Sequence, residues 1–482
     1  MMKVYNSLTF QKEEFVPLEP EKVKMYVCGV TVYGSPHLGH AKSAIAFDLI
    51  HRYLKYKGYE VNIVKNYTDI DDKIIKSSQE SNEDYRIISK RYIDEYEEIM
   101  EMLNVEKDTR NPRATEVIDL IIKFTQELIS KGHAYERNGS VYFSVKSFPK
   151  YNSILQRIKE HANNSEEEDY LVDQDTAFGE DKLDKRDFAL WKKMKEGEPY
   201  WESPWGKGRP GWHIECSVMI LNYLGETIDI HGGGQDLRFP HHRNEIAQSE
   251  SYSGKPFAKY FLHNGYVNVN NEKMSKSLNN FFTVADIIKD YDPLVIRWYL
   301  ISSHYRSSNN YTPDSMEPAK KTYNRLINTI KKVNYAEFSE ETSKQLNVLN
   351  SKIIESKDKI IEAMDDDFDT PVALAELLTL FREINKAILQ DDLKINQSFK
   401  NQFLNYLKFI NEIFGIFPFL KSKTLPFSTV GTNEKDNLIK SLINLIVDTR
   451  NKLREKKLYD ISDIIRDRLK ELGLDIEDKK VK

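Results

Sequence analysis

The 482-residue chain lacks the features that mark secreted and membrane-spanning proteins. Its first residues hold no apolar stretch that could act as a secretory signal, and no segment approaches the roughly 18 apolar residues that span a bilayer. Internal repeats and long low-complexity linkers are also missing. We therefore expect a cytoplasmic protein with no membrane partner.

Cysteine is scarce, since Cys28 and Cys216 are the only two in the chain. A disulfide is not expected in a compartment that keeps thiols reduced. By count alone, two free thiols in a hydrophobic core are the simplest interpretation. The residues around them, described below, favour a metal site instead.

An excess of charge of one sign is also lacking, because the net charge is only −5. This composition does not by itself indicate nucleic-acid binding. Charge is uneven, however: residues 421–482 carry fifteen Lys and Arg against eleven Asp and Glu, or +4, which leaves −9 for the rest. A mildly basic tail on an acidic body permits RNA contact without establishing it.

The chain does have the composition of a packed globular protein, with 27 Tyr and 23 Phe, and its length suits about three folding units. Residues 23–33 are rich in β-formers, and the break at 34–36 is followed by a helical pattern over 37–57. A second strand is predicted over 60–66. Strand, crossover helix and parallel strand make a βαβ unit, so we predict an α/β fold with a Rossmann-like parallel sheet.

Later segments differ in character. Residues 84–132 are predicted to be helical, whereas 133–205 contain short β-prone pieces and an acidic run, which indicates an insertion into the first domain. Long amphipathic patterns dominate after about Asp314. One such helix is predicted to begin at Asp369-Thr370-Pro371, a capping residue followed by proline in the first turn.

Two motifs suit phosphate chemistry. In His37-Leu38-Gly39-His40, two imidazoles three residues apart lie on one face at a helix start, where unpaired N–H groups add positive potential. Gly39 lets a nucleotide lie close to the backbone. Alone, this short pattern occurs by accident often enough to leave its function open.

The second motif is Lys273-Met274-Ser275-Lys276-Ser277, which follows a predicted strand at 265–269. Two ammonium groups and two hydroxyls on a loop suit a triphosphate and a departing pyrophosphate, although a solvated basic loop would look similar. In this order, and after these elements, the two motifs resemble the signature pair of class I aminoacyl-tRNA synthetases.

Histidines gather in the middle of the chain, where five of eleven fall between 213 and 263. His241 and Glu245 are four residues apart, which on a helix places an imidazole beside a carboxylate, as a zinc site requires. Packing alone does not explain such a cluster. His213 and His242 are expected to be structural.

Over nearly its whole length the chain resembles the cysteinyl-tRNA synthetase family, through residues 26–40, 66–73, 208–219, 229–248 and the Lys273 pentad. The resemblance implies one zinc ion per chain. The matching zinc ligands are Cys28, Cys216, His241 and Glu245. The positions that border the amino-acid pocket match Thr68, Trp212 and His231.

The resemblance also implies how ATP is bound. Catalytic roles fall to His37, His40, Lys273 and Lys276, of which Lys276 is the principal ATP lysine. The adenosine would face Gly232, Gly233, Gly234 and Asp236, with Asp236 contacting the ribose hydroxyls. Mg²⁺ would accompany ATP, and a monomer is expected from the family.

The implied reaction is activation of L-cysteine as an adenylate and transfer to tRNA-Cys. Combined with the patterns above, it predicts a catalytic domain in two halves (1–132 and 206–255), an insertion (133–205), a signature-loop and stem-contact region (256–313), a helical bundle (314–412) and a small anticodon-binding domain (413–482). One alternative is a ligase of the same ancestry that passes cysteine to an amino-sugar. Another is a catalytically silent RNA-binding paralogue.

Overall fold

The structure is a computed structural model, and it describes residues 1–161, 181–273, 281–390, 393–421, 446, 449, 452–453 and 459–471. The chain divides into two compact units, Met1–Pro418 and Phe419–Lys482. Helix α16 (Tyr459–Glu471) belongs to the second unit. None of the helices in the described part of the chain has the length and apolar character that crossing a bilayer requires.

A parallel sheet forms the centre of the first unit, as predicted. In the described residues its strands lie in the order β10-β9-β3-β4, and every neighbouring pair is parallel. The strands are β3 (Lys22–Thr31), β4 (Glu60–Thr68), β9 (Ile228–Gly234) and β10 (Ala258–Asn264). The chain moves from β3 outward to β4, and β9 pairs with the other edge of β3. This reversal of strand order is where α/β sheets form ligand-binding crevices.

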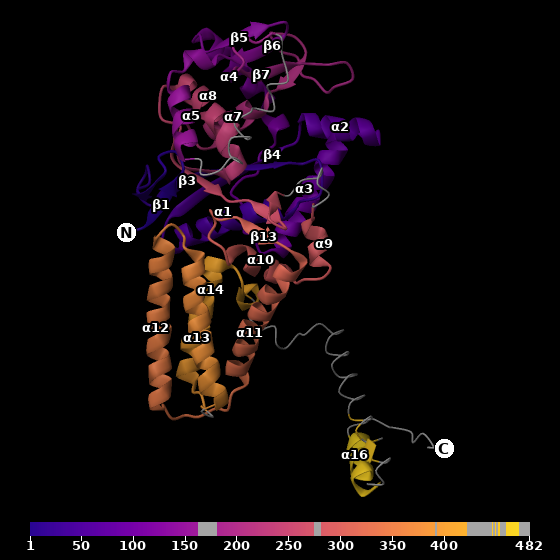
Figure 1. Cartoon of the computed structure of the whole chain (residues 1–482), viewed down its shortest axis with the longest axis vertical. Coiled ribbons are helices and arrows are strands. Elements are labelled where there is room, and N and C mark those ends of the chain that lie inside the picture. The colour runs from indigo at the N-terminus through magenta and orange to yellow at the C-terminus, as the bar shows by residue number, and fades with distance from the viewer. Residues whose placement is uncertain are drawn as a thin grey trace, which may run out of the picture. The chain divides into compact units, whose positions relative to one another are not determined.

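Helices cover both faces of this sheet, as Figure 1 shows, with α7 and α8 on one side and α1 on the other. Helix α1 (Leu38–Tyr56) begins where Gly34-Ser35-Pro36 ends the strand pattern, and it closes at Lys57 before Gly58 turns the chain at φ 93°. The other helices are α2 (Asp72–Ser81), α3 (Tyr85–Met102), α4 (Ile118–Ser130), α7 (Trp212–Tyr223) and α8 (Arg243–Ser253).

The predicted insertion contains a sheet of its own. Its described strands are antiparallel and lie in the order β5 (Ala134–Arg137), β6 (Ser140–Phe143), β7 (Phe188–Lys193) and β8 (Gly208–Pro210), with α5 (Lys150–His161) between β6 and β7. Arg209 and Lys192 of this sheet are ion-paired with Asp72 of α2, the latter at 3.1 Å, which fixes the insertion against the catalytic domain. At the N-terminus, β1 (Lys3–Asn6) and β2 (Gln11–Glu14) form a hairpin beside β10.

A small sheet links the catalytic domain to the helical region. Strand β11 (Val267–Val269) pairs with β12 (Glu272–Lys273) and with β13 (Asn309–Tyr311), and α9 (Val284–Ile288) and α10 (Pro293–Ile301) lie between β12 and β13. Lys42 of α1 donates to the Ser307 carbonyl at 2.5 Å and to Asn309, so this sheet is held against the helix that follows β3.

The C-terminal part of the first unit is a bundle of amphipathic helices that lie side by side below the catalytic domain in Figure 1. They are α11 (Met316–Tyr335), α12 (Lys344–Asp365), α13 (Thr370–Gln390) and α14 (Gln397–Phe414). Asp369 caps α13 by accepting from the Val372 N–H at 3.2 Å, so this helix starts where its sequence predicts. Its residues Leu374, Phe381 and Ile384 are buried. The predicted boundary at 412/413 falls inside α14, whereas the two compact units divide after Pro418.

Candidate active site

The first predicted motif caps helix α1. His37 is the N-cap residue, and its Nδ1 accepts from the backbone N–H groups of Gly39 at 3.0 Å and His40 at 3.4 Å. The Nδ1 of His40 in turn accepts from the His37 N–H at 3.3 Å, and the two rings stack with centroids 3.6 Å apart. Because both Nδ1 atoms accept, both neutral rings carry their proton on Nε2. The pair therefore presents two Nε2–H donors at the positive end of a helix.

The chain that flanks the second motif lies against the first one. The Val284 N–H donates to the Pro36 carbonyl at 2.9 Å, and the ring of Phe281 meets that of His37 edge-on at 5.1 Å. On the other flank, Lys273 pairs through its backbone with Asn268 in the β12–β11 ladder. The C-terminal flank of the pentad is thus anchored next to His37 and the N-terminal end in the β11–β12 ladder, while Lys276 lies outside the described residues.

A cluster of buried metal-ligating side chains lies where β3 and β9 meet. The ligand atoms of Cys28, Cys216, His241 and Glu245 all lie within 4.8 Å of one another. The two sulfurs are 3.8 Å apart, and Glu245 Oε1 lies 3.6 Å from Cys28 Sγ and 3.0 Å from His241 Nε2. Their exposures are 8, 3, 1 and 0 %, respectively. These are the four residues that the sequence predicts.

Four elements bring these ligands together. Cys28 lies in a β-bulge of β3, where the register to β4 shifts between Val27 and Val30. Gly29 makes the bulge possible, because a Cβ there would stand 1.5 Å from the Asn66 carbonyl oxygen. Cys216 comes from the second turn of α7. His241 comes from a short π-helical turn (Arg238–His242) and Glu245 from the start of α8. A bulge re-aims a side chain, which here turns Cys28 toward the cluster.

The electrostatics of the cluster favour a bound cation. Burial alone would raise the pKa of Glu245, but His231 and His241 lower it to about 2. Burial would lower the pKa of His241, yet the Glu245 carboxylate raises it to about 10. A hydrogen bond from Cys28 lowers the pKa of Cys216 to about 6, whereas burial raises that of Cys28. Two thiols, an imidazole and an ionised carboxylate, all buried, are the donor set that a zinc ion takes, so the site fits this metal.

A second group of potential ligands overlaps the first. Among the described residues, Cys28, His231, His242 and Glu245 also bring their ligand atoms within 4.8 Å of one another. However, His231 Nε2 lies 2.9 Å from Glu245 Oε2, and His263 Nε2 lies 2.9 Å from His242 Nδ1. His231 is therefore already paired with the carboxylate, and His242 is hydrogen-bonded through Nδ1 to His263.

The residues expected at the amino-acid pocket surround this cluster. The Trp212 ring lies 4.4 Å from that of His241, and His231 contacts Glu245 as described. Thr68, at the carboxyl end of β4, donates to Glu215 Oε2 at 3.1 Å. Glu215 was not singled out from the sequence, although it directly precedes Cys216. Burial raises the pKa of Glu215 well above its ordinary value, which favours its neutral form.

The glycine turn ends strand β9. Gly232 packs against Phe47 of α1 so closely that a Cβ would stand 2.3 Å from that ring. Gly233 and Gly234 follow at the carboxyl end of the strand, and Asp236 is exposed in the next turn. The His37–His40 motif follows β3, and the glycine turn ends the neighbouring strand β9. Both therefore lie at the same edge of the sheet as the cluster.

Comparison with known proteins agrees with this arrangement. The family of tRNA synthetases class I (C) catalytic domains matches residues 14–321, and the DALR domain family matches 359–418. Two solved structures of Mycobacterium tuberculosis methionyl-tRNA synthetase with methionyl-adenylate share the fold, with TM-scores of 0.60 and 0.61 at 15 and 13 % identity. The alignments cover 84 and 85 % of this chain and 92 and 97 % of theirs. The chain thus has the catalytic domain and the fold of a class I tRNA synthetase.

More similar relatives narrow this class. The cysteine–tRNA ligase of Persephonella marina is 44 % identical over 100 % of this chain and 98 % of its own length. That of Anoxybacillus flavithermus is also 44 % identical, over 99 and 97 % of the two chains. The chain belongs to the cysteine–tRNA ligase family.

Proposed function

We propose that this chain activates L-cysteine with ATP and transfers it to the 3′ end of tRNA-Cys. The observation that carries the proposal is the buried group of Cys28, Cys216, His241 and Glu245, of which Cys28 lies on β3, the strand that precedes the His37–His40 cap. Recognition of a thiol-bearing amino acid requires a soft metal site, and activation of that amino acid with ATP requires a phosphate site beside it. That the chain acts as a monomer in the cytoplasm is proposed from the family resemblance.

The reaction has two steps. The cysteine carboxylate attacks the α-phosphorus of ATP in line, the bond to the bridging oxygen breaks, and pyrophosphate leaves. A terminal ribose hydroxyl of the tRNA then attacks the carbonyl carbon of the adenylate, loses its proton, and AMP leaves. Neither step needs a covalent enzyme intermediate, so the protein acts by positioning and by stabilising charge.

His37 and His40 are proposed to stabilise the α-phosphate. Their Nε2–H groups and the N-terminus of α1 offer donors where negative charge accumulates, and each well-aimed donor contributes on the order of 10²–10³ in rate. Lys273 and Lys276 are proposed to hold the β- and γ-phosphates, with Mg²⁺ accompanying ATP. Gly39 allows the nucleotide close to the backbone.

Adenosine is proposed to lie over the end of β9. Of the glycines Gly232, Gly233 and Gly234 that are proposed to face it, Gly234 is the partly exposed one, and without a side chain it lets a nucleoside approach the backbone. Asp236, which is exposed directly after them, is the proposed acceptor for the ribose hydroxyls.

Cys28, Cys216, His241 and Glu245 would hold one zinc ion, whose chemistry is to bind the substrate sulfur as a thiolate. The substrate sulfur would either add to these four protein donors or take the place of one of them. Glu245 would be the donor suited to give way, because its Oε2 is held by His231 at 2.9 Å. Thr68 and Trp212 would border the rest of the amino acid.

This arrangement explains selection of cysteine over serine. An apolar pocket distinguishes such isosteres by only about 10². A hard hydroxyl is a poor ligand for a thiolate-rich metal site, so ligation can supply the remaining discrimination. A separate editing site is then not required.

The proposal is tested by pyrophosphate exchange and by tRNA charging. The protein should catalyse cysteine-dependent exchange between ATP and pyrophosphate and should attach cysteine to tRNA-Cys. Exchange without charging, together with transfer of cysteine to an amino-sugar, would support the alternative ligase instead. Absence of exchange in zinc-loaded, folded protein would exclude both.

A further inference from the structure

A small cavity beside the cluster of potential metal ligands is left unexplained by the proposed function. Its volume is about 20 Å³, which is room for one particle of the size of a water molecule or slightly larger. Two arginines and two histidines line it, namely Arg238, Arg243, His242 and His263, together with Ser7 and apolar side chains. None of these lining residues is acidic. The cavity therefore gathers positive charge and hydrogen-bond donors in a space too small for an amino acid or a nucleotide.

The guanidinium of Arg243 is the least satisfied group of this cavity. The residue is 1 % exposed, and none of its Nε, Nη1 and Nη2 atoms has a hydrogen-bond partner among the described residues. The charged side chain that acts on it is Arg186, which repels it. An arginine keeps its proton in proteins, and a buried charge is costly unless it is paired. Arg243 therefore lacks the counter-charge that its burial requires.

Two aromatic rings hold this guanidinium without neutralising it. Its central carbon lies 3.4 Å from the ring centre of Tyr151 and 5.3 Å from that of Phe239. A ring face attracts a cation, but the N–H donors in the guanidinium plane still need acceptors. The Tyr151 hydroxyl is engaged elsewhere, since it donates to Asn244 Oδ1 at 2.6 Å. The rings thus position Arg243 and leave its donors available.

The histidine pair supplies a further donor whichever ring donates to the other. His263 Nε2 and His242 Nδ1 lie 2.9 Å apart, so one of these two nitrogens carries the hydrogen between them. The outer nitrogens, His263 Nδ1 and His242 Nε2, are buried and have no hydrogen-bond partner in the described part of the chain. Burial and the nearby Arg238 lower the pKa of His263, which keeps its ring neutral. Because a neutral imidazole has one hydrogen, one of the two outer nitrogens is an N–H donor.

We propose that this cavity is a binding site for a single halide ion, such as chloride. The charges of Arg243 and Arg238 attract the anion, and the guanidinium N–H groups of Arg243 donate to it. The volume selects a monatomic ion, because phosphate, sulfate and carboxylate groups have several heavy atoms and need more than about 20 Å³. A water molecule fits the space, but it brings no negative charge to two arginines. Leu8 and Ile154 line the cavity and are partly exposed, which gives an ion a route from solvent.

The position of Arg243 gives the ion a structural role. Arg243 is the first residue of α8, and Glu245 of the cluster follows two residues later. A halide that pairs with Arg243 would compensate the guanidinium charge and so stabilise the start of the helix that carries Glu245. This role goes beyond the proposed function and requires neither ATP nor tRNA.

Bromide, which scatters X-rays anomalously, is the probe for the site. Crystals of the zinc-loaded full chain, grown without halide, are soaked in sodium bromide, and an anomalous difference map is calculated at the bromine edge. The map should show a peak in the cavity at hydrogen-bonding distance from Arg243. This measurement uses the unaltered protein and so does not depend on the folding of any variant.

Variants then test which groups hold the ion. Arg243→Met keeps a long, flexible side chain without charge and should lose the bromide peak. Arg238→Gln, which changes a partly exposed residue, should lower the bromide occupancy and carries the comparison if Arg243→Met does not fold. Lys150→Gln on α5 is the matched control, because it removes one positive charge from an exposed ion pair with Glu250 outside the cavity. The control should keep the peak.

Melting curves test the site in solution. A ligand that binds only the folded chain stabilises it by mass action, so wild type should melt about 1–3 °C higher in sodium chloride than in sodium gluconate of equal ionic strength. Lys150→Gln should show the same difference, and Arg243→Met should lose it. General effects of the two salts act on all three proteins alike, so the comparison isolates the cavity.

Three results would overturn the inference. One is a cavity in the wild-type crystals without anomalous signal, which would mean that water fills it. Another is an equal bromide peak in Arg243→Met, which would make bromide an adventitious ion only. The third is the same chloride dependence of melting in wild type and in Arg243→Met.

Discussion

His231 is fully buried and lies 2.9 Å from Glu245 through Nε2. The resemblance puts this residue at the border of the amino-acid pocket, and that placement stays a prediction. Replacing a residue that hydrogen-bonds a metal-binding carboxylate, without itself binding the metal, typically lowers metal affinity by about 10–100-fold. We propose that His231 contributes to substrate recognition by orienting Glu245.

Two overlapping sets of ligands make the metal assignment testable with single substitutions. Cys216→Ser should leave well under one zinc per chain, because a hydroxyl is a poor soft-metal ligand. Preference for cysteine over serine should fall toward about 10², while ATP binding through the His37 motif should persist. His231→Gln should still bind zinc at saturating metal, with affinity reduced about 10–100-fold. Metal analysis and pyrophosphate exchange with both amino acids check these outcomes.

A second buried histidine provides the control. His263 contacts His242 and not Glu245, so His263→Gln should affect zinc affinity less than His231→Gln does. If His231→Gln cannot take up zinc at all while Cys216→Ser binds it normally, then His231 and His242 are the ligands and the proposed set is wrong.

The sequence predicts individual side chains well where the chemistry is local. The pair His37 and His40 requires only a helix start, and the i, i+4 spacing of His241 and Glu245 requires only a helical turn, even though this turn is a π-helical one. The bulge at Cys28 and the contact of His231 with Glu245 were not predictable in this way. They depend on how β3, β9 and α8 meet, which is determined by packing over more than two hundred residues of chain.

Among the helices, α1 connects the active site to the bundle through one buried acid. Asp48 accepts from Arg52 at 2.8 Å and pairs with Arg297 of α10, and Arg297 donates to the Phe414 carbonyl of α14 at 2.7 Å. Burial would raise the pKa of Asp48, but Arg297 and Arg52 lower it to about 2. The carboxylate therefore keeps its charge across the physiological range and fixes three helices to one another.

Replacing this acid should destabilise the first unit. Asp48→Asn leaves Arg297 buried without a counter-charge, and such a loss costs about 3–5 kcal/mol. Because the folded pKa lies below the ordinary 3.8, the stabilisation by the charge is fully present above that value and is lost as pH falls through about 2. The stability gap between wild type and variant should thus be constant from pH 8 to 5 and narrow below about pH 4.

Urea unfolding at pH 7, 5 and 3.5 measures this gap. Glu355→Gln on α12 is the control, since its ion pair with Lys359 is exposed to solvent and stabilises the fold little at any of these pH values. A gap of similar size for both variants at pH 7 would show that Asp48 does not stabilise the junction.

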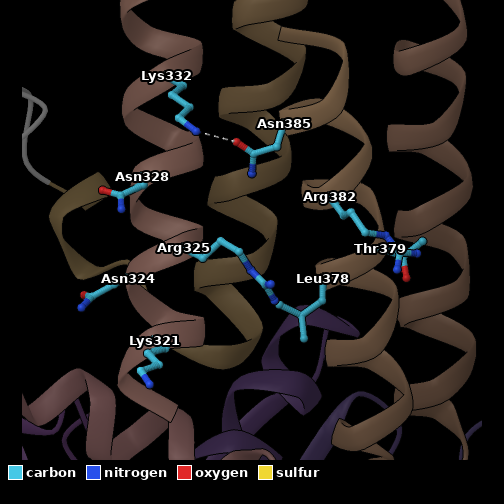
Figure 2. Close-up of a pocket in the computed structure, with 9 residues that line it drawn as sticks. All are labelled: Lys321, Asn324, Arg325, Asn328, Lys332, Leu378, Thr379, Arg382 and Asn385. Carbon is cyan, nitrogen blue, oxygen red and sulfur yellow. Dashed lines mark hydrogen bonds between the residues drawn. The ribbon is translucent and has the colours of Figure 1, made fainter. Parts of the chain in front are cut away.

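Helix and strand bounds were largely predictable, because β3, α1 and β4 each begin or end at a glycine or proline break that the printed sequence shows. The groove between α11 and α13 that Figure 2 shows was not. Two of its lining residues, Lys321 and Arg382, lie on helices separated in sequence by all of α12, so the groove exists only once α11 and α13 are packed.

For the chain as a whole, the division between units decides where it can be cut. Phe414, Ile416 and Phe417 are fully buried, and Tyr323 of α11 donates to the Ile416 carbonyl at 2.8 Å. The residues that precede Phe419 therefore belong to the bundle. A cut at the predicted boundary of 413 would remove them, whereas a cut after Pro418 follows the compact units.

Two truncated chains test this. The chain 1–418 should fold and keep cysteine-dependent pyrophosphate exchange within about 3-fold, but should charge tRNA-Cys poorly if residues 419–482 read the RNA. The chain 1–412 should melt much lower, because burial of a single core Phe contributes about 3–5 kcal/mol. Normal charging by 1–418 would mean that the C-terminal unit does not recognise the tRNA.

Both cysteines of the chain are buried in the cluster of potential metal ligands, and this has a practical consequence for labelling. A cysteine introduced at exposed Val348 of α12 or Ile461 of α16 would be the only thiol that a maleimide dye reaches in the folded, metal-loaded protein. Fluorophores attached at these two positions could report the distance between the first unit and the C-terminal unit. The protein thus lends itself to energy-transfer measurements on the native chain, without removal of any cysteine of its own.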